Sequence, residues 1–459
     1  MSAEGDMGRL TYWTNPSVRR ISSSDDPVSD FVTITRRIVF EAMQKGWKGP
    51  PFDPFKLADT LHIDVAPTED VLDARTVPAP GGKVRIEFNP NRPIARVRYS
   101  VAHEIAHTFF PDCREYVRER RAKSSGGSDE WQLEMLCNVG AAELLMPIGS
   151  FQNLEQESLN IDTLTRLRKD YDVSTEALLL RAIRLTNSAC FVFCSSRQKI
   201  ADSYGRYKLD YAVFSRGVNA KLPPGVLLPK GSQVENCTAI GYTAKGDEVW
   251  PGAVGKVHVE CVGLPPYPGH RFPRVAGIST LFARESAESS RIEYVKGDAT
   301  RPRGGGNKMI AFVINDRGRS WGAGFARAVQ KKWPQVLNDF QDWLGSHPRD
   351  FALGNIATAR IDTALMAVMM ISQQGYGEST KPRIRYEALE KCLSHLAEEA
   401  IKFRASVHMP RIGSGQAGGS WWVIRELIDA TLVKRGISVT VYELPESGKE
   451  DKRQMSFGL

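Results

Sequence analysis

The feature that most constrains this chain is the segment His103-Glu104-Ile105-Ala106-His107. Two histidines four residues apart lie about one turn from each other on the same face of a helix, where both can bind one metal ion. A glutamate next to the first histidine can act as general base toward an attacking water. Apolar residues at helical spacing flank the segment and predict a buried helix from Arg96 to Phe110, ended by Pro111. The alternative, a solvent-exposed helix that carries these residues by chance, does not explain those apolar flanks.

A catalytic zinc site needs a third protein ligand and one open position. The run DEWQLEMLCNVGAAELLMP predicts a second helix, which starts near Ser128 and ends at Pro147. Glu134 and Glu143 are the carboxylates of that helix expected on the side that could face a metal. Spacing alone ranks Glu134 first and Glu143 second, and an ordinary exposed glutamate is the alternative for each.

Size and composition predict a soluble protein of about three domains. The chain has 459 residues, of which 42% are hydrophobic and 25% charged, as in ordinary globular proteins. The longest apolar run, near Ala364 to Ile371, is too short to span a bilayer, so no membrane partner is expected. The first residues lack the apolar core of a signal peptide, which predicts a cytoplasmic location.

The net charge of +8 is unevenly distributed. Residues 1–186 carry 24 basic and 27 acidic side chains, whereas residues 291–446 carry 22 basic and 16 acidic ones. The excess of positive charge near the C-terminus favours an anionic ligand there. Because no dense run of Lys and Arg with interleaved aromatics is present, nucleic-acid binding is compatible with the sequence but has no support in it.

The pattern of residues changes twice along the chain. Residues 187–290 contain short alternating runs separated by Pro and Gly turns, which predict a small antiparallel β-rich domain. Residues 291–446 alternate strand-like and helical runs, which predict an α/β domain around a largely parallel sheet. Two strand-to-helix junctions there, NDRGRSWGAGFA and GSGQAGGSW, are rich in glycine. Such loops let backbone N–H groups approach phosphate oxygens at a helix start, which favours a diphosphate ligand.

The first segment resembles the ImmA/IrrE family of bacterial zinc metallopeptidases. The resemblance rests on PFDPFKLADTLHIDV, RYSVAHEIAHTFF, EMLCNVGAAELLMP and LRKDYDVSTEALLLRAIRL, over about residues 35–186. It implies Zn²⁺ held by His103, His107 and Glu134, with Glu104 as the base that polarises the attacking water. Some members of this family carry a GAF-like sensor domain, which the β-rich middle segment resembles weakly.

The last segment resembles a macrodomain, closest to the branch of terminal ADP-ribose glycohydrolases and DNA ADP-ribosyl hydrolase antitoxins. The resemblance rests on YVKGDATRP, VINDRGRSWGAGFARAVQKKWP, RYEALEKCL and HMPRIGSGQAGGSW. It implies that Asp298 binds the adenine amine, whereas the local alternative is a turn residue. Asn315 would lie near the distal ribose, with a strand-end cap as its alternative. The loops expected to border the distal ribose and to cradle the diphosphate contain Gly322, Ala323 and Gly324, and Gly413, Ser414, Gly415, Gln416, Ala417, Gly418 and Gly419.

The chain departs from that branch at two positions. A lysine after the third strand and an aspartate in the phosphate loop are common there, but the corresponding stretches are ISQQGYG and GSGQAGG. The sequence therefore favours ADP-ribose binding over hydrolysis, with Gln373 and Gln374 as candidates to orient a water.

Together these patterns predict a multidomain protein of α+β and α/β class. Its parts are a mainly helical zincin-like domain over 31–186, an antiparallel β-rich domain over 187–290, and a three-layer α/β macrodomain over 291–446. The leading hypothesis is a zinc endopeptidase that cleaves a regulatory protein, such as a transcriptional repressor, under the control of ADP-ribose. One alternative is an ADP-ribosyl hydrolase or reader that acts on modified protein or nucleic acid and uses the metal domain for recruitment. A third is a non-enzymatic regulator in which zinc is structural.

Overall fold

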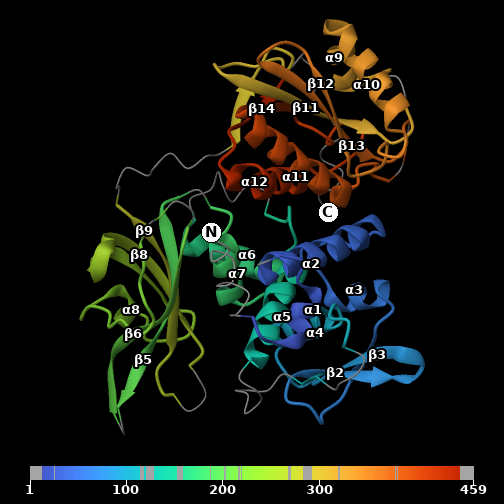
Figure 1. Cartoon of the computed structure of the whole chain (residues 1–459). Helices are drawn as coiled ribbons and strands as arrows, with labels where there is room; N and C mark the ends of the chain where they lie inside the picture. Colours follow the sequence, from blue (N-terminus) through green and yellow to red (C-terminus); the bar gives the residue numbers. More distant parts are fainter. Residues whose placement is uncertain are drawn as a thin grey trace, which may run out of the picture. The chain divides into compact units, whose positions relative to one another are not determined.

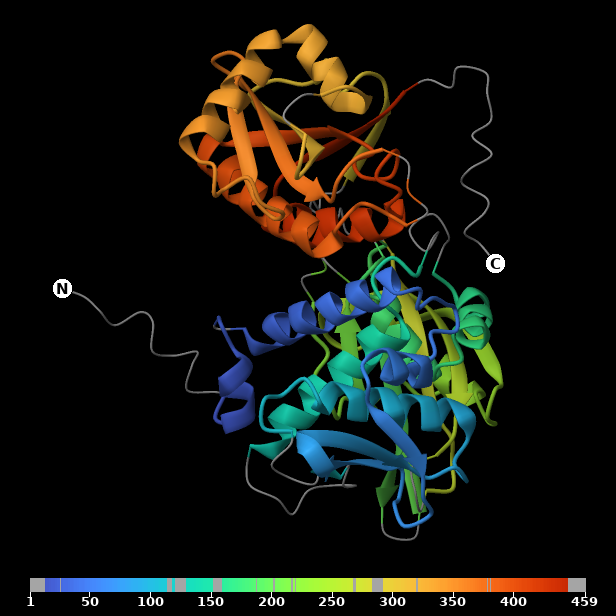
Figure 2. The ribbon, with the colours of Figure 1, turned by 90° about the vertical axis from the view of Figure 1, so that its right-hand side faces the viewer.

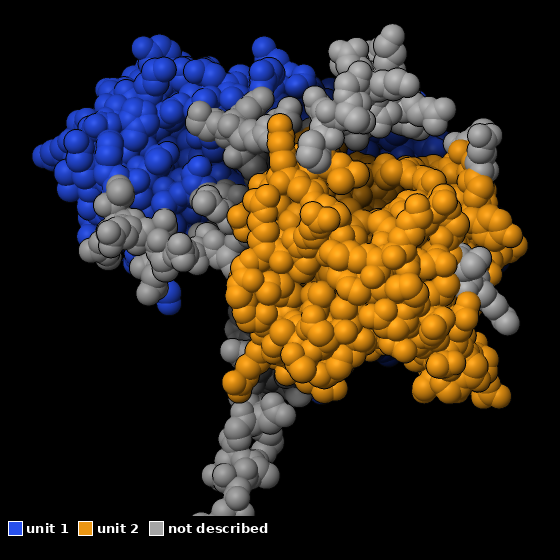
Figure 3. All heavy atoms as spheres, turned by 90° about the horizontal axis from the view of Figure 1, so that it is seen from above, with its two compact units in different colours: residues 1–289 blue, residues 290–459 orange. Residues whose placement is uncertain are grey.

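The chain divides into two compact units, Met1–Ser289 and Ser290–Leu459, coloured separately in Figure 3. Both combine helices with sheets, which confirms the prediction of a multidomain protein of mixed α and β structure. The first unit contains both the expected metallopeptidase and β-rich domains, and the boundary between these two stays a prediction. No helix in the described part of the chain is long and apolar enough to cross a bilayer. The computed structural model describes residues 13–24, 26–113, 118–119, 129–151, 159–186, 188–200, 203–215, 218, 220–266, 270–282, 292–318, 321–377, 379 and 381–444.

Three helices at the start of the first unit begin where Asn or Asp precedes a proline. These helices are α1 (Pro16–Ile21), α2 (Pro27–Gln44) and α3 (Pro54–Thr60). The side chains of Asn15, Asp26 and Asp53 accept hydrogen bonds from N–H groups of the first turn. Proline suits the first helical position because it has no N–H to leave unpaired there. The helix expected from Phe31 therefore starts four residues earlier, at Pro27.

A four-stranded sheet with the order β1-β3-β2-β4 follows these helices. Its strands are β1 (Asp64–Pro67), β2 (Ala74–Ala79), β3 (Lys83–Phe88) and β4 (Arg118–Glu119). The sequence predicted β3 but placed VPAPGG in a loop, whereas β2 runs to Ala79 and pairs antiparallel with β3. The short helical turn η1 (Pro80–Gly82) joins the two strands, and Gly81 and Gly82 take the positive φ values that this tight reversal requires.

Helices α4 (Ile94–His107) and α5 (Glu130–Leu145) pack against each other in the first unit (Figure 1). Helix α4 ends at His107 and not at Phe110, because the next three N–H groups bond to carbonyls three residues back and tighten the chain. At Gly140 of α5, an added Cβ would lie 2.8 Å from Cε1 of Phe31 and 2.9 Å from Cβ of Ala106. The absence of a side chain at Gly140 thus lets α5 approach both α2 and α4.

A five-stranded antiparallel sheet with the order β6-β5-β9-β8-β7 completes the first unit. Phe191, Phe193 and Trp250 are fully buried at the centre of its core. One ion pair and one hydrogen bond join this sheet to helices α7 and α6. Nη1 of Arg274 lies 2.8 Å from Oε2 of Glu176, and Oε2 of Glu260 accepts a hydrogen bond of 3.1 Å from the N–H of Ile161. The elements are α6 (Ile161–Tyr171), α7 (Thr175–Ala182), β5 (Cys190–Ile200), β6 (Ser203–Phe214), α8 (Gln233–Asn236), β7 (Thr243–Trp250), η2 (Gly252–Val254), β8 (Gly255–Leu264) and β9 (Arg274–Leu281).

The second unit is built on a six-stranded sheet with the order β10-β15-β14-β11-β13-β12. All its strand pairs are parallel except that of β12 with β13. Helices α9 and α10 cover one face of the sheet, and α11 and α12 cover the other (Figures 1 and 2). The elements are β10 (Ile292–Lys296), β11 (Asn307–Asn315), α9 (Gly324–Lys332), α10 (Pro334–Ser346), β12 (Ile356–Arg360), β13 (Leu365–Gln373), α11 (Tyr386–Phe403), β14 (Ala405–Pro410), α12 (Trp421–Thr431), η3 (Val433–Arg435) and β15 (Val439–Glu443).

The parallel pairing brings four connections to one edge of this sheet. Residues 297–306, 316–323, 374–385 and 411–420 follow the carboxyl ends of β10, β11, β13 and β14. In open α/β sheets this edge is where ligands bind. In this unit the sequence missed helix α10, although Pro334 marks its start. It also missed β12, because this short edge strand, IATAR, has little hydrophobic alternation.

The approach of α5 to α4 predicts opposite effects of two Gly-to-Ala changes. We expect Gly140→Ala to destabilise the protein by about 1–2 kcal/mol, because overpacking costs more than the gain in helix propensity. Gly345→Ala in α10, where nothing lies within 4 Å of an added Cβ, should instead stabilise it by about 0.5 kcal/mol. Urea unfolding followed by circular dichroism measures both. An unchanged or higher midpoint for Gly140→Ala would contradict this packing.

Candidate functional site

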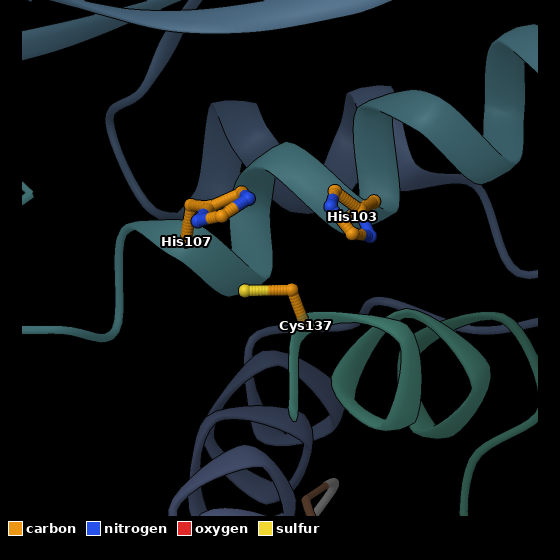
Figure 4. Close-up of side chains that lie close together, drawn as sticks. All are labelled: His103, His107 and Cys137. Atoms are coloured by element: carbon orange, nitrogen blue, oxygen red, sulfur yellow. The ribbon is translucent and has the colours of Figure 1, made fainter. Parts of the chain in front are cut away.

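The two histidines of the HEIAH segment lie side by side on α4 and are fully buried (Figure 4). Nε2 of His103 is 3.2 Å from Oε2 of Glu134, and Nε2 of His107 is 3.4 Å from Oε1 of the same carboxylate. Glu134 belongs to α5, so the packing of the two helices brings these three side chains together. Two side chains of α4 and one side chain of α5 therefore face one another.

The three side chains have the spacing of metal ligands. Two ligand atoms about 2.0–2.1 Å from a zinc ion, at a tetrahedral angle, lie about 3.4 Å apart. The distances of 3.2 and 3.4 Å between the imidazole nitrogens and the carboxylate oxygens match this separation. Two imidazoles and one carboxylate are also the ligand set of a common class of catalytic zinc site. This set of donor groups and its two separations therefore fit a metal ion of that kind.

The electrostatics of Glu134 are consistent with a metal ligand. Burial by itself raises the pKa of this carboxyl, but hydrogen bonds with His103 and His107 and the charges of those imidazoles outweigh it. The net effect holds the pKa of Glu134 far below its usual value of 4.5. The carboxylate is therefore ionised at neutral pH, as a metal ligand must be.

The structure separates the two glutamates of α5 that the sequence ranked as candidate metal ligands, Glu134 and Glu143. Glu143 is buried on α5, where its carboxylate lies 3.9 Å from Nε of Arg36 and 3.6 Å from Nη1 of Arg181. These two guanidinium groups neutralise the Glu143 carboxylate in the interior. The structure thus places Glu134, and not Glu143, beside the two histidines.

Cys137 also reaches this site, and the sequence did not indicate it (Figure 4). It lies one turn after Glu134 on α5, is fully buried, and its Sγ and the ring nitrogens of His103 and His107 all lie within 4.8 Å of one another. The signal was its spacing of three residues from Glu134, which puts both side chains on one helix face. Glu134 and Cys137 are therefore both placed beside the two imidazoles, where either can be the third ligand.

Glu104 is buried beside the histidines and is held by a residue of the neighbouring sheet. The hydroxyl of Thr76 in β2 donates a hydrogen bond of 2.7 Å to Oε2 of Glu104. Thr76 is itself fully buried, so it fixes the direction of the carboxylate. The sequence missed Thr76 because the pairing of β2 beneath α4 is a long-range contact.

In the second unit, two predicted ligand-binding residues stabilise turns at the carboxyl edge of the sheet. The carboxylate of Asp298 accepts hydrogen bonds from the N–H of Thr300 at 2.9 Å and from its hydroxyl at 2.8 Å. Oδ1 of Asn315, the last residue of β11, accepts from the N–H groups of Arg317 and Gly318. Asp298 is therefore a turn residue and Asn315 is a strand-end cap, which are the two local alternatives considered from the sequence.

The two glycine-rich loops meet at that edge. Gly322 and Ala323 precede α9, and a Cβ on Gly324, its first residue, would lie 3.7 Å from Oε1 of Gln416. The loop from Gly413 to Gly419 is closed on itself, because the N–H of Gly419 donates to the carbonyl of Gly413 at 2.9 Å. The expected borders of the ribose and the diphosphate thus lie side by side.

Part of that second loop has backbone N–H groups available for an anion. The amides of Ser414, Gly415, Gln416 and Ala417 make no backbone hydrogen bond within the part of the chain that the structure describes. Four successive N–H groups of this kind can surround phosphate oxygens. The loop therefore has the donors that a diphosphate requires.

Comparison with known proteins supports both resemblances. Residues 63–182 match the family model of the IrrE N-terminal-like domain. The radiation response metalloprotease IrrE of Deinococcus deserti is 31% identical over 140 residues, which cover 29% of this chain and 50% of that protein. Human ADP-ribose glycohydrolase OARD1 is 30% identical over 162 residues, which cover 35% of this chain and 96% of that protein. A solved macrodomain protein from Streptomyces coelicolor is 41% identical, covers 33% of this chain and 99% of its own, and has a TM-score of 0.30. The chain is an IrrE-like domain fused to a macrodomain.

Other relatives of this IrrE-like macrodomain protein are much longer than the part that matches. Chromodomain-helicase-DNA-binding protein 1-like of Mus musculus is 31% identical over 180 residues, which cover 37% of this chain. The chain spans 19% of the length of that protein and 16% of its Danio rerio counterpart.

The geometry at α4 and α5 predicts one metal ion per chain. We expect Glu134→Gln to weaken binding of Co²⁺ to chelator-treated protein by more than about 100-fold, since even the loss of an outer partner of a metal ligand costs 10–100-fold. Glu130→Gln, an exposed change on the same helix, should leave the affinity unaltered. Absorption spectra also report on Cys137, because a cobalt–thiolate bond gives an intense near-ultraviolet band. That band, together with unchanged affinity in Glu134→Gln, would contradict carboxylate ligation.

Proposed function

We propose that this protein is a zinc-dependent endopeptidase of a regulatory protein, such as a transcriptional repressor, and that ADP-ribose bound to its macrodomain controls it. The observation that carries the peptidase is the Glu134 carboxylate, whose two oxygens lie 3.2 and 3.4 Å from the two imidazoles next to Glu104. The match of residues 63–182 to the IrrE N-terminal-like domain and the metalloprotease relative support it. A mainly helical, zincin-like metallopeptidase domain over residues 31–186 belongs to this proposal.

In this proposal His103, His107 and Glu134 would hold the zinc. Zinc in such a site acts as a Lewis acid that brings the pKa of a water ligand close to neutral and polarises a carbonyl. Glu104 accepts the proton of the attacking water and delivers it to the leaving amine. Thr76 is a positioning residue, because its hydrogen bond to Oε2 orients the Glu104 carboxylate.

Removal of the base tests the peptidase without removal of the metal. We expect Glu104→Gln to lower kcat for cleavage of the target protein by at least about 100-fold, because general-base catalysis contributes about 10²–10⁴-fold. Its metal content should stay at about one zinc per chain, since Glu104 is not a ligand. Thr76→Val should lower kcat with little effect on KM, whereas Thr76→Ser keeps the hydroxyl and should restore the rate.

Full cleavage by Glu104→Gln would contradict the peptidase. It would instead favour the alternatives in which the IrrE-like domain recruits a substrate or holds zinc for structure alone. In the structural case His103→Ala should also unfold the first unit, which thermal denaturation detects.

For the second unit, residues 291–446, we propose a three-layer macrodomain that binds ADP-ribose at the carboxyl edge of its sheet. The amides of Ser414 to Ala417 would hold the diphosphate, with Gly413, Gly418 and Gly419 shaping the loop, and Gly322, Ala323 and Gly324 would border the distal ribose. Asp298 would bind the adenine amine, because each carboxylate oxygen has a second lone pair. Asn315 would offer its Nδ2 to a ribose hydroxyl while Oδ1 caps the strand.

Binding is favoured over hydrolysis by the surroundings of the glutamines after β13. The side-chain amide of Gln373 donates to the carbonyl of Gly375 at 2.9 Å, and Oε1 of Gln374 accepts from Nε of Arg385 at 2.8 Å. Both amides are thus used within the loop, so neither is well placed to activate a water. The alternative function, an ADP-ribosyl hydrolase, is favoured by the similarity to human ADP-ribose glycohydrolase OARD1.

A side chain in the loop from Gly413 to Gly419 tests the ADP-ribose site. An added Cβ on Gly415 meets nothing within 4 Å, so Gly415→Val should fill the proposed cradle without disturbing the fold. We expect isothermal titration with ADP-ribose to show binding by the natural protein and a loss of at least about tenfold in this variant, because a branched side chain would occupy the place of the phosphates. Gly305→Val, also in open space but next to the amino end of β11, is the matched control.

Equal ADP-ribose affinity in the two valine variants would place the ligand elsewhere.

Control of the peptidase by ADP-ribose is a separate part of the proposal. Coupling between the two sites requires that the ligand change the cleavage rate or the binding of the target. Identical cleavage rates with and without saturating ADP-ribose would remove that part alone.

A further inference from the structure

Two cysteine side chains lie in contact in the core of the five-stranded sheet of the first unit. Sγ of Cys237 is 3.5 Å from Sγ of Cys261, and both residues are free thiols. Cys237 directly follows α8, Cys261 belongs to β8, and both side chains are fully buried. A disulfide needs a separation of about 2.05 Å between its sulfurs, which rotation of the two side chains about their Cα–Cβ bonds can provide. The two thiols are therefore close enough to form one.

The backbone after Cys237 is fixed against β8, which holds the two sulfurs together. A Cβ added to Gly263 would lie 2.0 Å from the carbonyl oxygen of Ala239, so a residue without a side chain is needed for this approach. The N–H of Gly241 donates to the carbonyl of Gly263 at 2.8 Å, and the N–H of Gly263 donates to the carbonyl of Tyr242 at 2.9 Å. Helix α8 also packs against β7 and β8. The fold thus creates the contact between the thiols, because 24 positions separate the two cysteines in the sequence.

The two thiols differ in acidity. The hydrogen bond with Cys261 lowers the pKa of Cys237, although burial opposes this effect. The same contact, together with burial, raises the pKa of Cys261. Cys237 is therefore the first of the two to form a thiolate, which is the form of cysteine that attacks oxidants. Cys261 is then a neighbouring thiol within reach of the oxidised sulfur.

The segment that covers Cys237 is short and lies at the surface. Helix α8 has only four residues, and the residues on either side of Cys237, Asn236 and Thr238, are both exposed. Opening of so short a helix disturbs few contacts, so it exposes the thiol at a small cost relative to unfolding of the whole unit. A small oxidant can therefore reach a sulfur that is buried in the closed state.

We propose that Cys237 and Cys261 are a redox-active pair, which hydrogen peroxide converts to a disulfide. The Cys237 thiolate attacks one peroxide oxygen and the O–O bond breaks, which leaves a sulfenic acid and a hydroxide that takes up the proton released by Cys237. The Cys261 sulfur then attacks the Cys237 sulfur, and its proton leaves with the sulfenic oxygen as water. Together the thiols lose two electrons, and the peroxide is reduced to two molecules of water. Exchange with a dithiol reductant restores both thiols.

The disulfide would join the end of α8 to β8 and close the chain between residues 237 and 261. It would thereby prevent the opening of α8 and hold the exposed side chains of Ile240 and Tyr242 in place after it. The inference is independent of the proposed zinc and ADP-ribose sites, since neither site includes these residues.

The experiment identifies the thiols that hydrogen peroxide oxidises in the full chain. Treated and untreated protein are alkylated with iodoacetamide in denaturant, digested without reductant and analysed by mass spectrometry. We expect the treated protein to yield one linked pair of peptides that contains Cys237 and Cys261, lighter than the two free peptides by two hydrogen atoms. Dithiothreitol added before alkylation should abolish this product.

Thermal denaturation gives a second measurement. The thermal midpoint of the first unit should rise by about 5 °C or more on oxidation, because the closed loop restricts the unfolded chain. Cys237→Ser and Cys261→Ser should each abolish the linked peptides and this rise. Cys392→Ser, which changes a buried thiol of the second unit, is the matched control and should keep both responses.

Recovery of Cys237 and Cys261 in alkylated form after treatment, or as two separate sulfinic acids, would overturn the inference. So would an equal yield of the linked peptides from protein unfolded in urea, because the pairing would then owe nothing to the fold. The peptide analysis of the natural protein decides the matter even where a serine variant does not fold.

Discussion

The contact between the Glu134 carboxylate and the imidazoles of His103 and His107 is the constraint on which the IrrE-like domain depends. Two fully buried imidazoles and a half-buried carboxylate meet there, and burial of the imidazoles without a partner would be costly. Their distances of 3.2 and 3.4 Å require α4 and α5 to pack closely, which Gly140 allows because an added Cβ would collide with Ala106. The sheet then adds Thr76, whose hydroxyl holds Glu104 from the opposite side. Helix packing and sheet pairing thus each contribute a different part of one site.

The macrodomain forms its site in a different way. Parallel strands place four connections at the same edge of the sheet, so residues far apart in the sequence, such as Gly324 and Gln416, become neighbours. The proposed ligand contacts there are mainly backbone N–H groups, and a side chain on Gly415 would occupy the place of the ligand. The metal site is defined by which side chains are present, whereas this one is defined largely by backbone N–H groups.

Local signals predicted most of the elements. The helix from Pro54, the spacing of His103 and His107, and the buried strands of the second unit all depend on residues close in sequence. Helices α1 and α10 and the first turn of α2 were missed although their signals are local. The other errors occur where residues outside the segment decide the outcome. The edge strand β12 was missed, β2 was placed partly in a loop, and Thr76 and Cys137 were not connected with the histidines. Each of these depends on a partner at least 28 residues away or on another element.

The sequence by itself determined that two histidines and a glutamate share one turn of a buried helix, and that glycine-rich turns follow two strands. It also fixed the family resemblances, since motifs of this kind are local patterns. The sequence ranked Glu134 above Glu143, and the tertiary structure placed Glu134 beside the histidines and Glu143 between Arg36 and Arg181, although both glutamates occupy the same helix. Only the tertiary structure brought Sγ of Cys237 to 3.5 Å from Sγ of Cys261. The physical reason is that helical and strand periodicity fix the direction of a side chain, whereas the packing of elements fixes what that side chain meets.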